Sequence, residues 1–300
     1  MEIPERFAQL MRAIYGEAGE VWLAGLPELL AECARRWELE LLPPFELSYN
    51  YVAPARRADG TPVVLKVGVP NRELLSEIAA LRHYDGRGVA RLLEADPARG
   101  ALLLERLLPG EPLVTLADDD RATEIAAGVM RALWRPPPEG GTFPHMADWL
   151  AGFGRMRRHF GGGCGPFPAP LVAQAEAVAA ELLATADAPV LLHGDLHHFN
   201  ICAASSGVWL AIDPKGLLGE PAYEVGALLR NPLPQLLRAP EPGRVLERRL
   251  DILSGALEID RARLRDWGMV QALLSAWWSV EDEGAGWEPA LAVAELLAAL

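Results

Sequence analysis

Residues 191–216, LLHGDLHHFNICAASSGVWLAIDPKG, gather side chains that could carry out chemistry. The segment holds three histidines, one asparagine and two aspartates between an apolar run and a glycine. Imidazole and carboxylate groups can bind a metal ion for hydrolysis. Carboxylates and an amide can instead hold magnesium and orient a hydroxyl for phosphoryl transfer. The same residues can also serve packing alone, and their spacing distinguishes these alternatives.

The metal-hydrolase alternative requires several imidazoles to converge on one ion. His193, His197 and His198, with Asp195, supply the residue types, but their spacing matches neither HExxH nor another zinc signature. The three cysteines are far apart and form no CxxC pair, which argues against a cysteine-based zinc site and a disulfide framework. We therefore favour packing, capping or hydrogen-bonding roles for these histidines.

The phosphoryl-transfer alternative needs an aspartate at the acceptor hydroxyl, two magnesium ligands and a lysine at the nucleotide. Four residues separate Asp195 from Asn200, as in the catalytic loop of protein kinases. Asp213 follows the apolar run VWLAI, and a hairpin can return it to the side of Asn200. Lys66 ends the strand-like VVLK, and Glu77 on the next helix is its candidate partner. The order of these five residues predicts a phosphoryl-transfer site.

The elements before residue 110 predict a small, strand-rich lobe. Asp59-Gly60 is a turn signal between two strand-like runs. Asn71 is the predicted N-cap of an amphipathic helix, and Gly86 is its predicted end. The predicted helices are 24–39 and 71–86, and the predicted strands are 43–54, 63–69, 89–95 and 101–107.

Beyond Pro109-Gly110, Ala/Leu-rich stretches with a helical period dominate. Short strands are expected only before the 191–216 segment and as a hairpin, ICAA and VWLAID, within it. The chain is therefore predicted to be α+β, with an N-terminal lobe over residues 1–106 and a C-terminal lobe over residues 107–300. The predicted helices of the second lobe are 118–133, 146–159, 171–186, 244–258, 261–282 and 289–300.

The charge of the chain bears on its partners. The formal net charge is −13, which disfavours nucleic acid and anionic membranes and attracts a cationic small molecule. No apolar run reaches the ~18 residues of a membrane span. The opening MEIPERFAQLMRAI lacks the basic-then-apolar order of a signal peptide. We expect a cytoplasmic protein with no nucleic-acid or membrane partner.

Several segments together resemble the aminoglycoside and hydroxyurea phosphotransferase family, which includes the streptomycin 6-kinases. The likeness runs from about Tyr51 to WWSVEDEG near the C-terminus. It implies a protein-kinase-like fold, in which a small lobe with an antiparallel sheet precedes a larger, mainly helical lobe. The segments that carry it are HGDLHHFN, AIDPKGLLGEPAYEV, LLRNP, VVLKV, EIAALRHYDG and LLLERLLPGEPL.

The resemblance also implies roles for individual residues, with ATP and Mg²⁺ as cofactors. Two departures from the family pattern are visible: no G-x-G-x-x-G precedes the strand lysine, and Glu224 stands where such kinases often have Asp. The implied roles are a catalytic base at Asp195, Mg²⁺ ligands at Asn200 and Asp213, a phosphate-binding lysine at Lys66 with its partner Glu77, and an adenine-reading hinge at Glu105, Arg106 and Leu107.

The expected function is transfer of the γ-phosphate of ATP to a hydroxyl of a small molecule. A streptomycin-like aminoglycoside is the favoured acceptor, and hydroxyurea or another small metabolite is the alternative. A nucleotide-binding pseudokinase that regulates a partner is a further alternative. The presence of Lys66, Asp195, Asn200 and Asp213 together favours the enzyme, because a pseudokinase has no need of all four.

Overall fold

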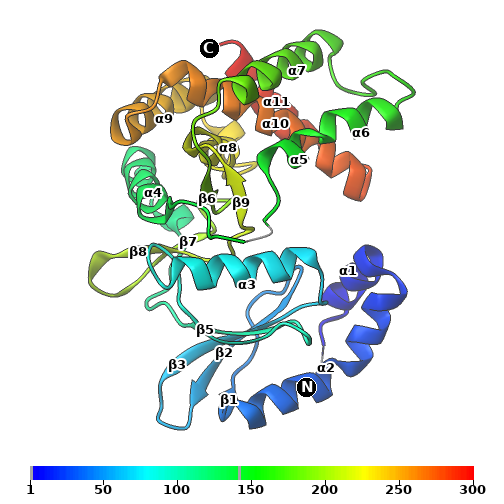
Figure 1. Cartoon of the computed structure of the whole chain (residues 1–300), viewed down its shortest axis with the longest axis vertical. Helices are drawn as coiled ribbons and strands as arrows, with labels where there is room; N and C mark the ends of the chain where they lie inside the picture. The colour runs from blue at the N-terminus through cyan, green and yellow to red at the C-terminus, as the bar shows by residue number, and fades with distance from the viewer. Residues whose placement is uncertain (1–2, 141–142) are drawn as a thin grey trace. The chain divides into compact units, whose positions relative to one another are not determined.

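The structure is a computed structural model, which describes residues 3–140 and 143–300 (Figure 1). The chain forms two compact units, Met1–Gly110 and Glu111–Leu300. The first contains the five-stranded sheet, and the second is mainly helical. The predicted α+β organisation is therefore confirmed.

The first unit is built on an antiparallel sheet with the strand order β1-β2-β3-β5-β4. The predicted turn joins β2 and β3: the Thr61 N–H donates to Asp59 Oδ1 at 2.8 Å, and Gly60 has a φ of 84°, which suits glycine. The strands are β1 (Leu39–Leu41), β2 (Tyr51–Arg57), β3 (Pro62–Val67), β4 (Leu92–Asp96) and β5 (Ala101–Glu105).

The two faces of this sheet are covered by different helices (Figure 1). Successive side chains of a strand point to opposite faces. Leu65 and Val67 of β3 lie in an apolar cluster with α1 (Glu5–Tyr15) and α2 (Glu17–Arg36). Lys66, between them, contacts α3 (Arg72–Tyr84) on the other face. The alternation in β3 thus directs its lysine toward α3.

The two largest boundary differences between prediction and structure in the first unit are at the starts of α2 and β2. The helix predicted over 24–39 is α2, which begins at Glu17 and follows the further helix α1. Gly19 lowers the helical propensity of that turn, but it lets α2 approach α1, since a Cβ there would meet the Met11 carbonyl. The strand predicted over 43–54 begins only at Tyr51. Its first residues include Pro43-Pro44, which cannot donate to a ladder.

The second unit packs around α10 (Arg261–Glu283), which contacts α6, α7, α8, α9 and α11 (Figure 1). Trp267 and Trp277 of this helix are fully buried, so it forms the centre of the helical core. The other helices are α4 (Asp119–Leu133), α5 (Met146–Leu150), α6 (Gly152–His159), α7 (Ala169–Ala184), α8 (Val225–Arg230), α9 (Pro242–Leu257) and α11 (Glu288–Ala298), with short 3₁₀ helices η1 (Leu113–Thr115), η2 (Ser205–Gly207), η3 (Pro221–Glu224) and η4 (Leu236–Arg238).

The helix predicted over 146–159 is two helices, α5 and α6, which meet at Ala151. Gly152 is the first residue of α6 and lies close to α10. A Cβ added at this position would lie 3.0 Å from the Leu274 side chain. The helical periodicity of the sequence continues through this point. The break therefore reflects a close tertiary approach that the local pattern does not show.

Two short antiparallel strand pairs in the second unit hold residues 191–216 in place. β6 (Val190–Leu192) pairs with β9 (Leu217–Gly219), and β7 (Ile201–Ala203) pairs with β8 (Trp209–Ala211). The β7–β8 hairpin was predicted, whereas β9 was not. Together the pairs fix both ends of the loop that joins β6 to β7 and of the turn that joins β8 to β9.

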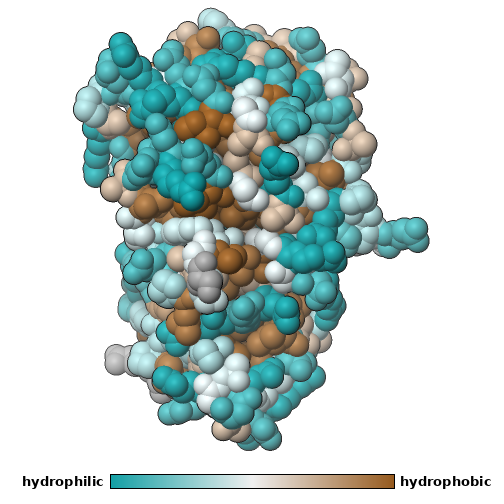
Figure 2. Space-filling model, turned by 90° about the vertical axis from the view of Figure 1, so that its left-hand side faces the viewer, coloured by the Kyte–Doolittle hydropathy of each residue, from teal (hydrophilic) through white to brown (hydrophobic). Residues whose placement is uncertain are grey.

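Figure 2 shows one face of the molecule, on which polar side chains predominate and apolar side chains form separate patches. Across residues 3–140 and 143–300, we find no helix with the length and apolar character needed to span a membrane.

Candidate active site

His193 anchors the start of the loop between β6 and β7. Its buried ring accepts a hydrogen bond at Nδ1 from the Asp195 N–H (3.2 Å) and donates from Nε2 to the Ile212 carbonyl (2.7 Å). These partners assign the neutral Nε2–H tautomer. Burial lowers the pKa of His193 to about 4. The predicted role of a hydrogen-bonded core histidine is confirmed, and the ring joins the loop to the turn after β8.

Glu224, the last residue of η3, holds the backbone of the same loop. Its carboxylate is buried and accepts hydrogen bonds from the N–H groups of His193 (2.7 Å) and Gly194 (2.9 Å). Burial disfavours the charged form and raises the pKa of Glu224 to about 7, which these two donors only partly oppose. The glutamate at the position where an aspartate was expected therefore supports the loop.

Asp195 projects from this loop with its side chain 26 % exposed. Its Oδ1 accepts a hydrogen bond from Arg230 Nη2 at 3.1 Å, and its Oδ2 lies 3.6 Å from His197 Nε2. Burial by itself would raise the pKa of Asp195. The neighbouring His197 and the positive charges of Arg230 and Lys215 outweigh burial and hold that pKa below its ordinary range. The carboxylate is thus ionised at neutral pH.

Asn200 and Asp213 come together through the β7–β8 hairpin. The Ile212 N–H donates to the Asn200 carbonyl at 2.9 Å, and Asp213 follows with a left-handed φ of 58°. Asn200 Nδ2 donates to the Asp195 carbonyl at 2.9 Å, which leaves Oδ1 as the acceptor of that amide. An amide oxygen and a carboxylate are hard oxygen donors of the type that Mg²⁺ accepts. The residues present therefore fit a magnesium ion.

The three histidines of the loop have different partners. His193 bonds Ile212, His197 lies against Asp195, and the buried His198 lies 3.5 Å from Arg249 through its Nε2. Among the described residues, no three or more His, Cys, Asp or Glu side chains are grouped so that they could hold a metal ion. The imidazoles diverge, so the geometry does not support the zinc-hydrolase alternative.

In the first unit, Lys66 on β3 forms a buried ion pair with Glu77 on α3. Nζ lies 2.7 Å from Oε1 and 2.8 Å from Oε2, and the two side chains are 3 % and 8 % exposed. Asn71 caps α3 by accepting from the Leu74 N–H at 2.8 Å, as predicted, and this sets where the helix begins. The structure thus brings together the lysine and the glutamate that the sequence order paired.

Glu105, Arg106 and Leu107 continue the chain from the end of β5. The Glu105 N–H donates to the Arg91 carbonyl at 2.8 Å, and the Glu105 Oε2 accepts from the Arg91 N–H at 3.2 Å. This pair of contacts ties the predicted hinge to the chain just before β4.

Two residues that contact the loop were not assigned from the sequence, Glu224 and Arg230. Arg230 is the single charge at the end of the apolar run VGALL, and this is the signal that could have found it. Lys215 lies two residues after Asp213, and its positive charge acts on Asp195. The loop carboxylate is therefore surrounded by more basic groups than the motif suggested.

A family model described as aminoglycoside/hydroxyurea antibiotic resistance kinase matches residues 43–283. The streptomycin 6-kinase of Streptomyces glaucescens is 35% identical over 302 residues, covering 97% of this chain and 94% of the relative. The hydroxyurea phosphotransferase of Kitasatospora aureofaciens is 36% identical over 314 residues, covering 99% of this chain and 86% of the relative.

Solved structures give a second comparison. The chain is similar to aminoglycoside phosphotransferase APH(4)-Ia, solved as a ternary complex with ADP and hygromycin B, with a TM-score of 0.64 and 16% identity over 90% of this chain and 96% of that one. It is also similar to the choline kinase LicA from Streptococcus pneumoniae, with a TM-score of 0.64 and 14% identity over 92% and 99%. At these identities the likeness establishes the fold, and the predicted protein-kinase-like fold is confirmed.

Proposed function

Because the chain belongs to the aminoglycoside/hydroxyurea antibiotic resistance kinase family, we propose that it transfers the γ-phosphate of ATP to a hydroxyl of a streptomycin-like aminoglycoside. The chain is a small-molecule kinase. The observation that carries the proposal is the partly exposed carboxylate of Asp195 on a loop whose Asn200 bonds both the Asp195 carbonyl and the N–H of Ile212, the residue before Asp213. The net charge of −13 favours a cationic acceptor. ATP as the phosphate donor supports the expected cytoplasmic location.

Asp195 would act on the acceptor. Its carboxylate would accept a hydrogen bond from the acceptor hydroxyl and so orient the oxygen toward the γ-phosphorus. As the new P–O bond forms and the bond to the ADP oxygen breaks, the hydroxyl proton passes to the carboxylate late in the step. A weakly basic carboxylate suffices, because the transition state of phosphoryl transfer places little demand on the nucleophile.

Asn200 and Asp213 would hold Mg²⁺ through the amide Oδ1 and the carboxylate. When bound, Mg²⁺ would neutralise the charge on the transferring phosphates. The hydrogen bond from Asn200 Nδ2 to the Asp195 carbonyl would orient the amide for this purpose.

The N-terminal residues 1–106 would form the nucleotide-binding lobe, and residues 107–300 the catalytic and acceptor-binding lobe. Lys66 would bind the nucleotide phosphates, with the Glu77 carboxylate orienting its ammonium group. Backbone groups of residues 105–107 would bind adenine. The Glu105 N–H already bonds the Arg91 carbonyl, so the other backbone groups of this segment supply the contact.

The test is a phosphorylation assay on the purified chain with Mg-ATP and a panel of aminoglycosides that includes streptomycin. Asp195→Asn is expected to lower kcat about 10²- to 10⁴-fold with little change in Mg-ATP affinity, because a general base acts in the transition state. The exposed Asp187→Asn is the matched control.

Each other outcome has a distinct meaning. Turnover of hydroxyurea without turnover of any aminoglycoside would replace the acceptor in this proposal. Mg-ATP binding without turnover across the panel would favour the regulatory pseudokinase. Full activity of Asp195→Asn would refute the assigned role of Asp195.

A further inference from the structure

Arg230 lies at the C-terminal end of α8, with its guanidinium directed to the carboxylate of Asp195. Its side chain is 13 % exposed, and its Nη2 donates to Asp195 Oδ1 at 3.1 Å. The second oxygen, Oδ2, lies 3.6 Å from His197 Nε2, which is longer than a hydrogen bond. The two oxygens of this carboxylate are therefore not equivalent, and Oδ2 has the greater capacity to accept a new hydrogen bond.

We propose that Arg230 is a positioning residue, which holds Oδ1 of Asp195 and thereby presents Oδ2 to the acceptor hydroxyl. This inference rests on the proposed function. The terminal torsion of an aspartate is broad and roughly two-fold, so an untethered carboxylate samples many orientations. A single strong donor at one oxygen selects among them. Because a charge-assisted hydrogen bond is short and directional, a guanidinium is well suited to this task.

The short helix α8 is attached at its start to the loop that carries Asp195. Glu224, immediately before α8, binds the N–H groups of His193 and Gly194 through a buried carboxylate. A helix of six residues is about 9 Å long, at about 1.5 Å per residue. The same element therefore reaches the loop twice, first at its backbone and then, through Arg230, at its reacting side chain.

The end of α8 is held by a buried arginine from α9. Arg249 is 1 % exposed, and its Nη1 donates to the carbonyls of Leu228 (3.1 Å) and Asn231 (2.6 Å), on either side of Arg230. Leu228 lies in the last turn of α8, where carbonyls lack the usual N–H partner four residues on, and Asn231 is the residue that follows the helix. The backbone from which Arg230 extends is thus fixed on both sides.

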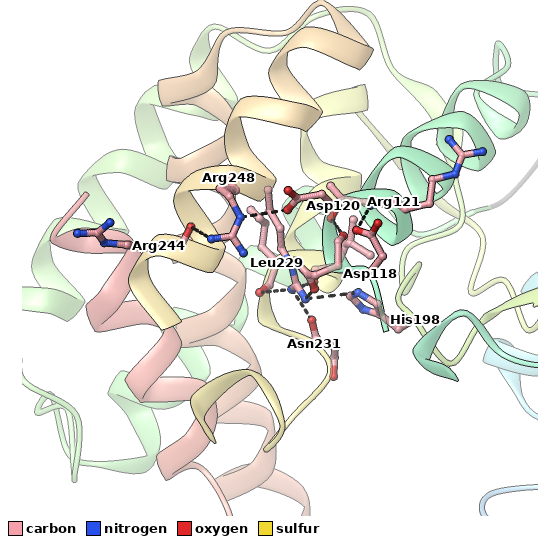
Figure 3. A network of polar contacts seen from close by, with 12 residues as sticks. Asp118, Asp120, Arg121, His198, Leu229, Asn231, Arg244 and Arg248 are labelled. Atoms are coloured by element: carbon pink, nitrogen blue, oxygen red, sulfur yellow. Dashed lines mark hydrogen bonds and ion pairs between the residues drawn. The ribbon is translucent and has the colours of Figure 1, made fainter. Parts of the chain in front are cut away.

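The same guanidinium extends the support to α4 and to the loop. Figure 3 shows the polar network around it, with His198 and Asn231 labelled. Arg249 Nε donates to Asp119 Oδ2 at 3.0 Å, and Nη2 lies 3.5 Å from His198 Nε2. The His198 carbonyl accepts from the Val114 N–H at 3.1 Å. The position of Arg230 relative to the loop is therefore set by one connected network, and a side chain so placed can define an orientation.

The first measurement is steady-state kinetics of Arg230→Ala with Mg-ATP and an aminoglycoside that the wild type phosphorylates. The expected result is a fall in kcat of about 10- to 100-fold, since small misplacements of a reacting group cost up to about 10²-fold. The KM for Mg-ATP should stay within about two-fold of wild type, because Asn200 and Asp213 are untouched. Guanidinium ion at non-denaturing concentration should restore part of kcat.

Two further variants make this result specific. Arg230→Lys keeps one positive charge and should lose less kcat than the alanine variant, and it also serves if the alanine variant does not fold. Arg248→Ala is the matched control, because it removes an arginine of α9 whose Nε lies 3.1 Å from Asp120. The control should keep wild-type kcat.

Unchanged kcat in Arg230→Ala would overturn the inference. So would a loss of both kcat and Mg-ATP binding that neither guanidinium nor Arg230→Lys restores, because that pattern indicates a purely structural role. If the wild type phosphorylates no acceptor, the proposed function fails, and crystal structures of the wild type and Arg230→Ala decide the inference instead. A rotated Asp195 carboxylate in the variant supports it, and an unchanged carboxylate refutes it.

Discussion

Replacing Glu224 by glutamine should change how the stability of the protein depends on pH. Both oxygens of Glu224 accept hydrogen bonds, from the N–H groups of His193 and Gly194, and both can still accept when the carboxyl group is protonated. A glutamine has one acceptor oxygen, and its amino group would oppose the other N–H. Leaving one buried donor unsatisfied costs about 1–3 kcal/mol, so Glu224→Gln should be less stable than wild type at mildly acidic pH.

The titration of Glu224 acts in the opposite direction, because it lowers the stability of the wild type relative to the variant as the pH rises. The pKa of Glu224 is raised from its ordinary value of 4.5 to about 7, so the folded state retains its proton more strongly than the unfolded state. The associated stability is complete below about pH 4.5 and is lost as the pH rises through about 7. Between about pH 5.5 and about pH 8 this loss amounts to about 2 kcal/mol in the wild type. Glutamine does not titrate, so the variant has no such pH-dependent loss of stability.

The assay is urea denaturation of both proteins at these two pH values, followed by the fluorescence of the nine tryptophans. The stability advantage of the wild type should shrink by about 2 kcal/mol at the higher pH. Buried His193 and His198 are common to both proteins, so their contribution cancels in the difference. Glu247→Gln, at an exposed position on α9, controls for the loss of one carboxylate. A stability difference independent of pH would refute the raised pKa of Glu224.

Three further perturbations test other parts of the structure. Lys66→Met removes the ammonium group from the buried Glu77 carboxylate and should destabilise the protein by about 3–5 kcal/mol in urea denaturation; a loss below about 1 kcal/mol would contradict the buried pair. Arg249→Met should lower stability by about 3 kcal/mol, or Tm by about 6–12 °C, and adding Asp119→Asn should recover part of it in thermal unfolding. If Asp119→Asn recovers no stability in the Arg249→Met background, the ion pair between Arg249 and Asp119 is contradicted. Asp213→Asn should raise the Mg²⁺ concentration that gives half-maximal ADP release, and an unchanged Mg²⁺ dependence would contradict its assignment as a ligand.

The sequence was most informative where the signal is local. The caps, turns and hairpins follow from neighbouring residues, so Asn71 at the start of α3, the turn at Asp59-Gly60 and the β7–β8 hairpin were predicted correctly. The pairing of Lys66 with Glu77 was also anticipated, since a strand followed by a helix brings these two positions to one face.

The predictions were wrong where tertiary contacts override a local pattern. α2 begins earlier than its periodicity indicates, because Gly19 permits a close approach to α1. The single helix predicted over 146–159 is broken at Ala151, next to the backbone approach of Gly152 to α10. Neither approach leaves a mark on hydrophobic periodicity, because glycine fits either pattern.

The sequence by itself determined the order of the chemical groups along the chain, the types of elements that carry them and the resemblance that names their reaction. Only the tertiary structure decided which distant charges reach the Asp195 loop. Glu224 and Arg230 lie 30 and 35 positions from their partners Gly194 and Asp195, and they meet them because α8 folds back along the loop. Hydrogen bonds between such residues depend on the packing of a whole unit, and no local propensity encodes that packing.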